Sequence, residues 1–545
     1  MRATTTIERT LRAGPVQGRG TEGEYLWLVY GPGEPRVVRD DLAAGTAPGS
    51  GDLVSLFHLG HLTDMQIADV QSPGRFEFFE RLRGLPGAGS YVPACRPQDP
   101  LVTQAVAAMV STLNRVPVSP ETGAPLGLCI STGDNLDNAQ LNELEWYLAL
   151  LGGGTVTPNS GGPTYQGVQG PGWQPGPYWC PEPGPDPFKE RFGFPVHPGL
   201  LADAIQTFRS PGLATPWLSC FGNHDGLVLG TALPTAAYER ILTGARKPVD
   251  LPPGLDAMAQ VEAFTSAPDV FASGPAHQVV ADPRRRTVGR REFVRAHLRA
   301  GGSPAGHGFV PGDIATETAY GVYDLDGPVP VRVVLLDTTN MDGYYQGSIG
   351  ARQFRWLEDR LAEVHSRHFD ANGRLVTTGA GDRLVVLASH HGLDTMVNER
   401  QDPTGLEQDH PRIGAEALEA LVHRFTNVVA WLNGHRHCND VQPRPDPSGR
   451  TGGFWEISTA AIADWPCQSR LVELVSQAGE VTILCTMLDA DVPADPGQAH
   501  GHERLAALHR ELAANDPYAG HGHGAEGRQG DRNIALRRRA PFPLG

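Results

Sequence analysis

Five apolar segments of this 545-residue chain each end in a short cluster of Asp, Asn or His side chains, which are common metal ligands in proteins. Each cluster alone has an ordinary interpretation, since Gly-Asp after a strand is usually a turn and His-x-His is usually solvated. Ligands of open α/β sheets lie at the carboxyl ends of strands, so five such clusters in succession predict one convergent site. The clusters are Thr63-Asp64-Met65-Gln66, Gly133-Asp134-Asn135, Gly222-Asn223-His224-Asp225, His390-His391 and Gly434-His435-Arg436-His437.

The ligand types in these clusters indicate transition metals. Carboxylate oxygens and imidazole nitrogens suit Mn, Fe and Zn better than Ca or Mg. Two Asp, one Asn and three His can hold two divalent cations if one Asp bridges them. Two ions about 3.5–4 Å apart polarise a phosphoryl oxygen and generate a hydroxide near neutral pH. Because charge neutralisation and positioning dominate phosphoryl transfer, this ligand set suits the hydrolysis of a phosphate ester.

Apolar strands directly before the clusters are the elements that must position them, and the glycines in three clusters permit tight turns and close backbone approach. Helical spacing of apolar residues predicts helices over 100–113, 139–151, 353–364 and 503–514. The pattern is that of an α/β chain. The predicted strands are 25–30, 53–62, 126–130, 216–221, 320–325, 331–337, 384–388, 428–432, 453–458, 469–475 and 481–487.

The domain organisation is expected to be one large domain with additions. We expect an N-terminal extension over 1–50, the main domain over 51–490, and a C-terminal helix with a polar tail over 491–545. Two insertions are expected within the main domain, at about 152–200 and 245–312. Long loops are usually functional or disordered, and the Trp and Tyr content of the first insertion favours an ordered one.

Composition excludes several classes of function. With 45 Lys and Arg against 61 Asp and Glu, the net charge of −16 argues against nucleic acid and against an anionic membrane as partners. Seven scattered Cys residues, without a C-x-x-C pair, favour reduced thiols and a cytoplasmic location. No apolar run approaches about 18 residues, so no membrane span is expected. The first twenty residues lack the apolar run of a signal peptide. The oligomeric state is not predicted.

The ordered clusters resemble the calcineurin-like metallophosphoesterase superfamily, whose pattern is D-x-H, G-D, G-N-H-D/E, H and G-H-x-H. The likeness spans about Leu53 to Asp440, and the wording His61-Leu62-Thr63-Asp64 and Asp69-Val70-Gln71-Ser72-Pro73 resembles a bacterial branch of that superfamily assigned mainly by similarity. The resemblance implies a four-layer sandwich of two mixed β-sheets flanked by helices. It also implies hydrolysis of a small phosphate mono- or diester by a hydroxide activated at a dinuclear metal site, with the ester unidentified.

The resemblance also implies a role for each cluster residue. His390 is preferred to His391 because the first His of such a pair usually aligns with the ligand. His224 is expected beside the phosphate as an acid or charge stabiliser, oriented by Asp225. The first metal is expected on Asp64 and His437 and the second on Asn223, His390 and His435, with Asp134 bridging the two.

One residue departs from the family pattern, because Gln66 stands where the first motif has its His. The Gln66 carbonyl oxygen is a candidate ligand that would favour Mn over Zn, since oxygen ligands suit Mn. Gln66 is alternatively a residue that only contacts the ligands, or its presence weakens the first metal site. The last alternative gives weight to a competing function, a catalytically weak or inactive binding protein that keeps the fold. A DNA nuclease is disfavoured by the negative charge.

Several other segments have both a functional and an ordinary interpretation. Residues close to the site either contact substrate or cap the following helix: Asn135, Asp137 and Asn138. Aromatic residues of the first insertion either line a pocket or pack within the insertion: Trp173, Tyr178 and Trp179. Charged and histidine-rich runs either bind phosphate or metal or are solvated: Arg284-Arg285-Arg286 and His521-Gly522-His523.

Overall fold

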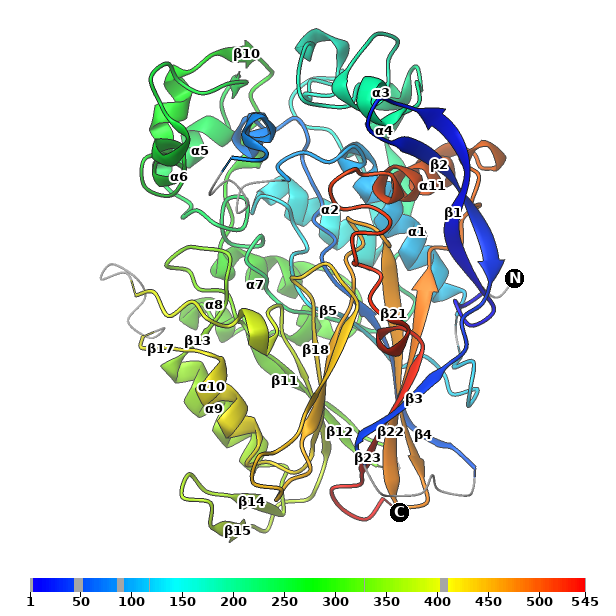
Figure 1. Cartoon of the computed structure of the whole chain (residues 1–545). Helices are drawn as coiled ribbons and strands as arrows, with labels where there is room; N and C mark the ends of the chain where they lie inside the picture. Colours follow the sequence, from blue (N-terminus) through cyan, green and yellow to red (C-terminus); the bar gives the residue numbers. More distant parts are fainter. Residues whose placement is uncertain are drawn as a thin grey trace.

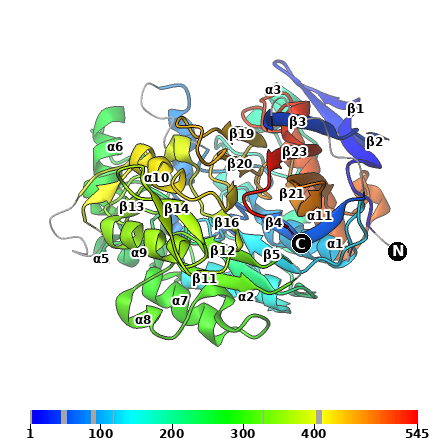
Figure 2. The same cartoon turned by 90° about the horizontal axis from the view of Figure 1, so that it is seen from below.

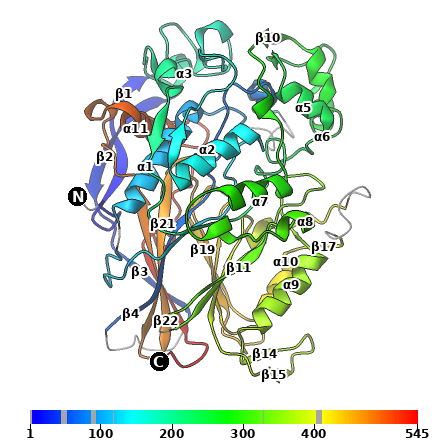
Figure 3. The same ribbon diagram turned by 180° about the vertical axis from the view of Figure 1, so that it is seen from behind.

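Two β-sheets packed face to face form the centre of the molecule, and helices cover their outer surfaces (Figure 1 and Figure 3). The structure is a computed structural model that describes residues 3–43, 52–85, 93–116, 118–327, 329–401 and 410–544, without the side chains of residues 257, 258 and 260–262. Each sheet contains both parallel and antiparallel pairs. The predicted α/β sandwich of two mixed sheets flanked by helices is therefore confirmed.

The larger sheet has seven strands within the described ranges. Its parallel part consists of β4 (Val54–Leu62), β5 (Leu128–Ser131) and β8 (Trp217–Ser219). On the other side of β4, β21 (Gln468–Gln477) and β22 (Glu480–Asp489) continue the sheet as antiparallel neighbours. Because β4, β5 and β8 run in one direction, the polar clusters that follow them meet at one edge of this sheet.

Strands from both ends of the chain complete the larger sheet. β23 (Ile534–Arg539) pairs with β22, and β3 (Val37–Leu42) pairs with β23 in parallel. We expected a polar tail where β23 lies. The segment forms a strand because Ile534 and Leu536 are buried between the sheets, while the neighbouring Arg537 pairs with Glu480 of β22. The domain boundary expected at 50/51 falls outside the described residues.

The smaller sheet has its four inner strands in parallel, so their carboxyl ends also share one edge. An antiparallel strand flanks them on each side. Counted over the described part of the chain it has six strands, in the order β11 (Gly321–Leu325), β12 (Val331–Leu335), β16 (Leu384–Ala388), β18 (Val428–Asn433), β20 (Phe454–Ser458) and β19 (Asp440–Arg444).

Three hydrophobic clusters divide the sandwich into its four layers. One fills the space between the sheets, and the other two bind each outer sheet face to its helices. Figure 2 shows the helices of the smaller sheet on the side opposite those of the larger one. None of the helices described is long and apolar enough to span a membrane. The larger sheet is covered by α1 (Val102–Asn114), α2 (Leu141–Gly152), α7 (Arg290–Arg299) and α11 (Gly501–Ala514), the smaller by α9 (Ala351–Ala362) and α10 (Ala415–Val422).

The N-terminal hairpin of β1 (Arg9–Arg19) and β2 (Glu24–Pro32) lies beside α11, far from it in sequence (Figure 1). The buried Tyr25 hydroxyl of β2 lies 3.0 Å from a Glu511 carboxylate oxygen and donates a hydrogen bond to it. The first insertion is ordered around the same helix, as its aromatic content indicated. Trp179 and the short helix α3 (Pro187–Phe192) pack with Tyr25 and α11 in one buried cluster.

The second insertion forms a small aromatic core with the loop after β4. Its α6 (Ala257–Ser266) contributes Phe264, which packs edge-on against Phe76 and Phe79. Two further strands of this insertion, β9 (Arg246–Pro248) and β10 (Ala276–Gln278), form an antiparallel pair. Figure 1 shows these elements above the sheet edge at which the predicted clusters meet.

Candidate metal centre

The five predicted clusters converge at the common edge of the two sheets. Loops after β4 and β5 run side by side, since the Asp64 N–H donates to the Gly133 carbonyl and the Gln66 N–H donates to the Asp134 carbonyl. The loop after β18 joins them, because the His435 N–H donates to Asp64 Oδ2 at 3.0 Å. Clusters separated by hundreds of residues are thereby in direct contact.

Glycines permit this close approach at two places. A Cβ on Gly434 would lie 1.9 Å from Thr63 Oγ1 and 2.3 Å from Asp64 Oδ2. A Cβ on Gly222 would lie 2.3 Å from both the backbone nitrogen and Oδ1 of Asp134. Any side chain at either position would push apart loops that carry candidate ligands, as the sequence pattern predicted.

Candidate site residues share an uncommon backbone conformation. Positive φ is rare for residues other than glycine, and such strain gathers at functional sites where the surroundings hold it in place. The Gln66, Asp134 and His435 backbones have φ of 39°, 49° and 69°, and those of Asp64 and His437 have φ of 48° and 51°. The fold therefore holds this set of side chains in a backbone geometry that relaxed chains avoid.

Three atoms that can accept a hydrogen bond face one another here, namely His390 Nε2, Asp134 Oδ2 and His435 Nδ1. The His390 Nδ1–H donates to the Thr132 carbonyl at 3.0 Å, which leaves Nε2 directed at the site. Nε2 lies 3.1 Å from Asp134 Oδ2 and 3.2 Å from His435 Nδ1. Burial lowers the pKa of His390, but the Asp134 carboxylate outweighs burial and raises it to about 9. The arrangement thus favours a positive charge at this point, either a proton or a cation.

Two buried oxygens lie beside this group. Asn223 Oδ1 has no hydrogen-bond donor among the described residues, and Asp64 Oδ1 has His437 Nε2 3.2 Å away. The Asn223 amide N–H donates to the Gly230 carbonyl at 3.1 Å, which fixes the orientation of its oxygen. A buried acceptor without a donor is costly unless something else compensates it. A divalent cation would satisfy both oxygens, so the donor set fits a metal centre.

His437 has the geometry of a metal-binding histidine with a carboxylate behind it. Its Nδ1–H donates to Asp464 Oδ2 at 2.5 Å, and its Nε2 lies 3.2 Å from Asp64 Oδ1. Burial lowers the pKa of His437, but Asp64 and Asp464 outweigh burial and raise it to about 10. Metal-ligating histidines commonly donate their second nitrogen to a carboxylate in this way.

Only one member of the His390-His391 pair has a nitrogen free for a metal. His391 Nδ1 lies 2.8 Å from the Thr338 hydroxyl, and its Nε2–H donates to the Tyr345 carbonyl at 2.8 Å. Its ligand atoms lie within 4.8 Å of those of His390 and His435, but both of its nitrogens are engaged. The geometry favours the choice of His390 over His391, and the full ligand assignment stays a prediction.

Gln66 lies at the site, but its carbonyl oxygen has another partner. Arg96 Nη2 donates to Gln66 Oε1 at 2.7 Å, so that oxygen is turned toward a guanidinium. Of the three interpretations, this contact favours the one in which Gln66 touches the site without binding metal. Physically, the neutral oxygen of an amide is a natural acceptor for a buried arginine.

His224 lies as predicted beside the candidate ligands, but a different residue orients it. Its Nδ1–H donates to the Asp137 carbonyl at 2.6 Å, and its Nε2 lies 3.9 Å from Asp134 Oδ2. Asp225 instead accepts N–H bonds from the loop after β5, two of them from Asn135 and Leu136 at 3.0 Å. A carboxylate that binds backbone donors so closely holds the loop of Asp134 and is not available to His224.

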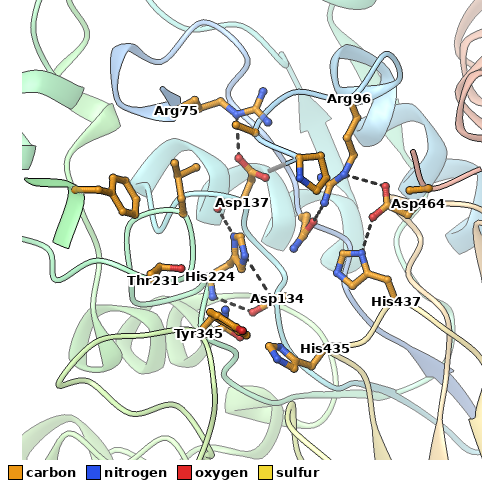
Figure 4. A pocket seen from close by; sticks show the side chains of 17 residues that line it. Arg75, Arg96, Asp134, Asp137, His224, Thr231, Tyr345, His435, His437 and Asp464 are labelled. Carbon is orange, nitrogen blue, oxygen red and sulfur yellow. Dashed lines mark hydrogen bonds and ion pairs between the residues drawn. The ribbon is translucent and has the colours of Figure 1, made fainter. Parts of the chain in front are cut away.

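A cavity of about 360 Å³ opens above the candidate ligands (Figure 4). Sequence reasoning missed Arg75, Arg96, Asp464 and Tyr345 among its lining residues. Asp464 follows the apolar run after β20, so it repeats the pattern of a polar residue at the end of a strand. No sequence pattern near Arg96 indicates a site residue. The lining residues are Gln66, Arg75, Pro93, Ala94, Arg96, Asp134, Asp137, Asn223, His224, Leu229, Thr231, Phe264, Tyr345, His435, His437, Asp464 and Ala519.

The residues after Asp134 do not cap the following helix, since Gln140 and Glu143 form the capping box of α2. Asp137 is the residue of this group that reaches the cavity, while Asn135 binds Asp225 and Asn138 Oδ1 accepts from the Leu229 N–H.

The other segments that have both a functional and an ordinary interpretation lie away from the cavity. Trp173 stacks on His277, and Tyr178 and Trp179 are buried within clusters of the first insertion. Arg285 is buried against Asp69, whereas Arg284 and Arg286 pair with acidic neighbours at the surface. His521 Nδ1 lies 2.9 Å from a carboxylate oxygen of Glu526. These contacts favour structural roles.

Comparison with known proteins adds little to this geometry. No family model matches the chain, and no curated protein matches it. Among solved structures that match is a Staphylococcus aureus protein described as a candidate 5′-nucleotidase, in complex with alpha-ketoglutarate. It is 12% identical with a TM-score of 0.27, and the match covers 82% of this chain and 58% of that one. The chain thus spans little more than half of that structure's length.

Proposed function

We propose that this protein is a metal-dependent phosphoesterase that hydrolyses a small phosphate mono- or diester at a dinuclear centre. The observation that carries the proposal is the convergence of acceptors at the sheet edge, among them the buried Asn223 Oδ1, which has no donor among the described residues, and Asp64 Oδ1, which faces His437 Nε2 at 3.2 Å. The residues expected to hold the first metal are Asp64 and His437, those for the second are Asn223, His390 and His435, and Asp134 is the bridge.

Two bound divalent cations would supply charge neutralisation at the phosphoryl group and a nucleophile at neutral pH. The Asp64 and Asp134 carboxylates place negative charge where the cations bind, and burial strengthens that attraction because the local dielectric is low. His224 contributes a proton at a defined atom. Since its Nδ1–H donates to the Asp137 carbonyl, the Nε2 that faces the cavity is the atom that can protonate a leaving oxygen.

The cavity supports a small substrate. Its volume of about 360 Å³ lies in the range of small-molecule pockets. Apolar side chains, including Leu229 and Phe264, are among its lining residues and would accommodate the organic group of the ester. Nucleic acid is a poor candidate because the net charge of the chain is −16.

The test combines metal analysis with turnover. The protein is stripped with a chelator, reconstituted with Mn²⁺, and assayed with p-nitrophenyl phosphate and bis(p-nitrophenyl) phosphate. We expect about two ions per chain and hydrolysis of at least one ester, both lost on chelation. One ion or none per chain, together with no turnover of either ester, would overturn the proposal.

A binding protein that keeps the fold without turnover is the second candidate. The contact that favours it is the one between Gln66 and Arg96, because it leaves the first metal with fewer protein ligands. Stoichiometric Mn²⁺ binding without hydrolysis of any mono-, di- or cyclic ester would support this candidate over the phosphoesterase.

A further inference from the structure

Two buried arginines above the candidate metal centre each hold a carboxylate that in turn leads to one histidine of the site (Figure 4). Arg75 Nε lies 2.9 Å from Asp137 Oδ2, and Arg96 Nε lies 2.8 Å from Asp464 Oδ1. The two arginine side chains are only 3% and 9% exposed. Neither belongs to a predicted cluster.

The first connection leads from Arg75 to His224. Asp137 receives Arg75 on its side chain, and its main-chain carbonyl accepts the His224 Nδ1–H at 2.6 Å. Because one residue makes both contacts, the ion pair with Arg75 restrains the residue whose carbonyl orients the imidazole. The expected result is a fixed direction for His224 Nε2, the atom that faces the cavity.

The second connection leads from Arg96 to His437. Asp464 binds Arg96 through Oδ1 and accepts the His437 Nδ1–H through Oδ2 at 2.5 Å. A carboxylate shared in this way fixes both the tautomer and the orientation of the histidine. The residue oriented in this way, His437, is a candidate metal ligand and not the candidate proton donor.

Asp99 joins the two connections. Its Oδ2 accepts from Arg75 Nη2 at 2.8 Å and from the Arg96 N–H at 3.0 Å, and its Oδ1 lies 3.6 Å from Arg96 Nη1. Asp99 is buried at the start of a 3-10 turn that leads directly into α1, a helix of the core. Both arginines are therefore anchored to a rigid part of the fold.

The charges of this group argue against a simple phosphate clamp. Two guanidinium groups lie among three carboxylates, those of Asp99, Asp137 and Asp464, so the group carries a net negative charge before any metal binds. Arginines already paired in this way are suited to hold carboxylates in place, and less suited to attract a further anion.

We infer that Arg75 and Arg96 are positioning residues with separate targets. Arg75 acts through Asp137 on the alignment of His224, and so on protonation of the leaving group. Arg96 acts through Asp464 on His437, and so on affinity for the first metal. Asp99 couples the two. This inference rests on the proposed phosphoesterase function.

The test compares Arg75→Gln with Arg96→Gln by two measurements. Calorimetric titration with Mn²⁺ measures metal affinity without reference to activity. Turnover of p-nitrophenyl phosphate and phenyl phosphate, or of the matching diesters, compares a good leaving group with a poor one at saturating Mn²⁺.

For Arg75→Gln we expect unchanged Mn²⁺ affinity and a loss of about tenfold or more in kcat with the poor leaving group, part of the full acid–base contribution. The loss with the good leaving group should be smaller, and KM should change little. For Arg96→Gln we expect Mn²⁺ affinity to fall about 10–100-fold, as for other residues behind a metal ligand. Excess Mn²⁺ should restore kcat with both leaving groups.

The matched control is Arg332→Gln, because Arg332 is also 9% exposed and also held by two carboxylates, Asp324 and Glu363, but lies at the start of β12, at the opposite end of that strand from the site. It should change neither measurement. Should Arg75→Gln or Arg96→Gln fail to fold, Arg75→Lys and Arg96→Lys keep the buried charge and should give the same separation in smaller measure.

Each outcome bears on the inference. Equal losses of metal affinity and of kcat in both arginine variants would overturn it and make the group one structural unit. An Arg75 variant that weakens Mn²⁺ binding would also overturn it. Wild-type protein that neither binds Mn²⁺ nor hydrolyses an ester would instead overturn the proposed function, which distinguishes the two failures.

Discussion

The cavity has a floor and a roof that differ in origin. The floor is the polar part of the lining, which comes from the loops after β4, β5, β8 and β18 and includes the candidate ligands Asp134, Asn223, His435 and His437. The roof is the apolar part of the lining, formed by Pro93, Ala94, Leu229, Phe264 and Ala519. Its residues come from a loop before α1, the second insertion and its approach, and the C-terminal segment.

The two regions are also held differently. Floor residues are fixed by the sheets themselves and by glycines that permit direct contact between loops. The second insertion, which carries Phe264, is fastened to the loop after β4 by two buried ion pairs, Lys247 with Glu77 and Arg285 with Asp69. We therefore expect metal binding to depend on the core and substrate choice to depend on the second insertion.

The sharpest test of the floor is Asp134→Asn, which keeps the shape of the side chain but removes a negative charge shared by two cations. We expect loss of at least one metal and a fall in turnover of at least about 10³-fold, beyond the 10–100-fold typical of residues behind the ligands. Elemental analysis and turnover at saturating Mn²⁺ measure both effects. Wild-type turnover in this variant would show that Asp134 is not the bridge.

His224→Ala tests the part of the floor that is not expected to bind metal. Turnover with a poor leaving group should fall about 10²–10⁴-fold, while the metal content stays at the wild-type value. An ester with a very good leaving group needs little protonation and should lose less. Equal losses for the two esters would indicate charge stabilisation instead of proton donation, and loss of a metal would make His224 a ligand.

Lys247→Met tests how the roof is attached. The Lys247 and Glu77 side chains are 0% and 1% exposed, so removal of the lysine leaves a buried carboxylate without its partner. We expect the free energy of unfolding, measured by chemical denaturation, to fall by about 3–5 kcal/mol. The folded fraction should keep its metal affinity but bind substrate more weakly, because the ion pair supports the roof and not the floor.

The control is Arg240→Met, at a pair of Arg240 and Asp269 whose side chains are 67% and 62% exposed. Exposed pairs are screened by solvent, so stability should change by less than about 1 kcal/mol. A Lys247 variant as stable as this control would show that the second insertion is held mainly by its aromatic core.

The floor could be predicted from the sequence because its signal is local. Asp64, Asp134 and Asn223 each follow a short apolar strand within a few residues, and parallel strands bring such ends together. The roof has no such signal, because Phe264 and Ala519 meet only through packing of distant segments. The C-terminal segment follows the same rule. Its arginines predict a polar tail from the sequence alone, but the segment forms β23, where Glu480 of β22 lies opposite them.

Interactions that depend on one side-chain rotation were also beyond the sequence. The family resemblance implied that Asp225 orients His224, yet the Asp225 carboxylate turns to backbone donors of the loop after β5. Arg96 shows the same limit, because nothing near it in the chain indicates contact with Gln66 and Asp464.

Gln66→Ala should have a smaller effect than the substitutions at Asp134, His224 and Lys247, because we expect Gln66 to lie on the floor without serving as a ligand. Its Oε1 accepts from Arg96 Nη2 at 2.7 Å, and Arg96 keeps its ion pair with Asp464 when that oxygen is removed. We therefore expect the Mn²⁺ concentration for half-maximal activity to change less than about threefold, against about 10–100-fold for Arg96→Gln. Gln66→His is the informative companion, since it places an imidazole where the family pattern has one. If that ring reaches the first metal, Zn²⁺ affinity should rise and the activity optimum should move away from Mn²⁺, because imidazole suits Zn. A large loss of Mn²⁺ activation in Gln66→Ala would contradict this assignment and restore Gln66 as a ligand, with its oxygen shared between Arg96 and the metal.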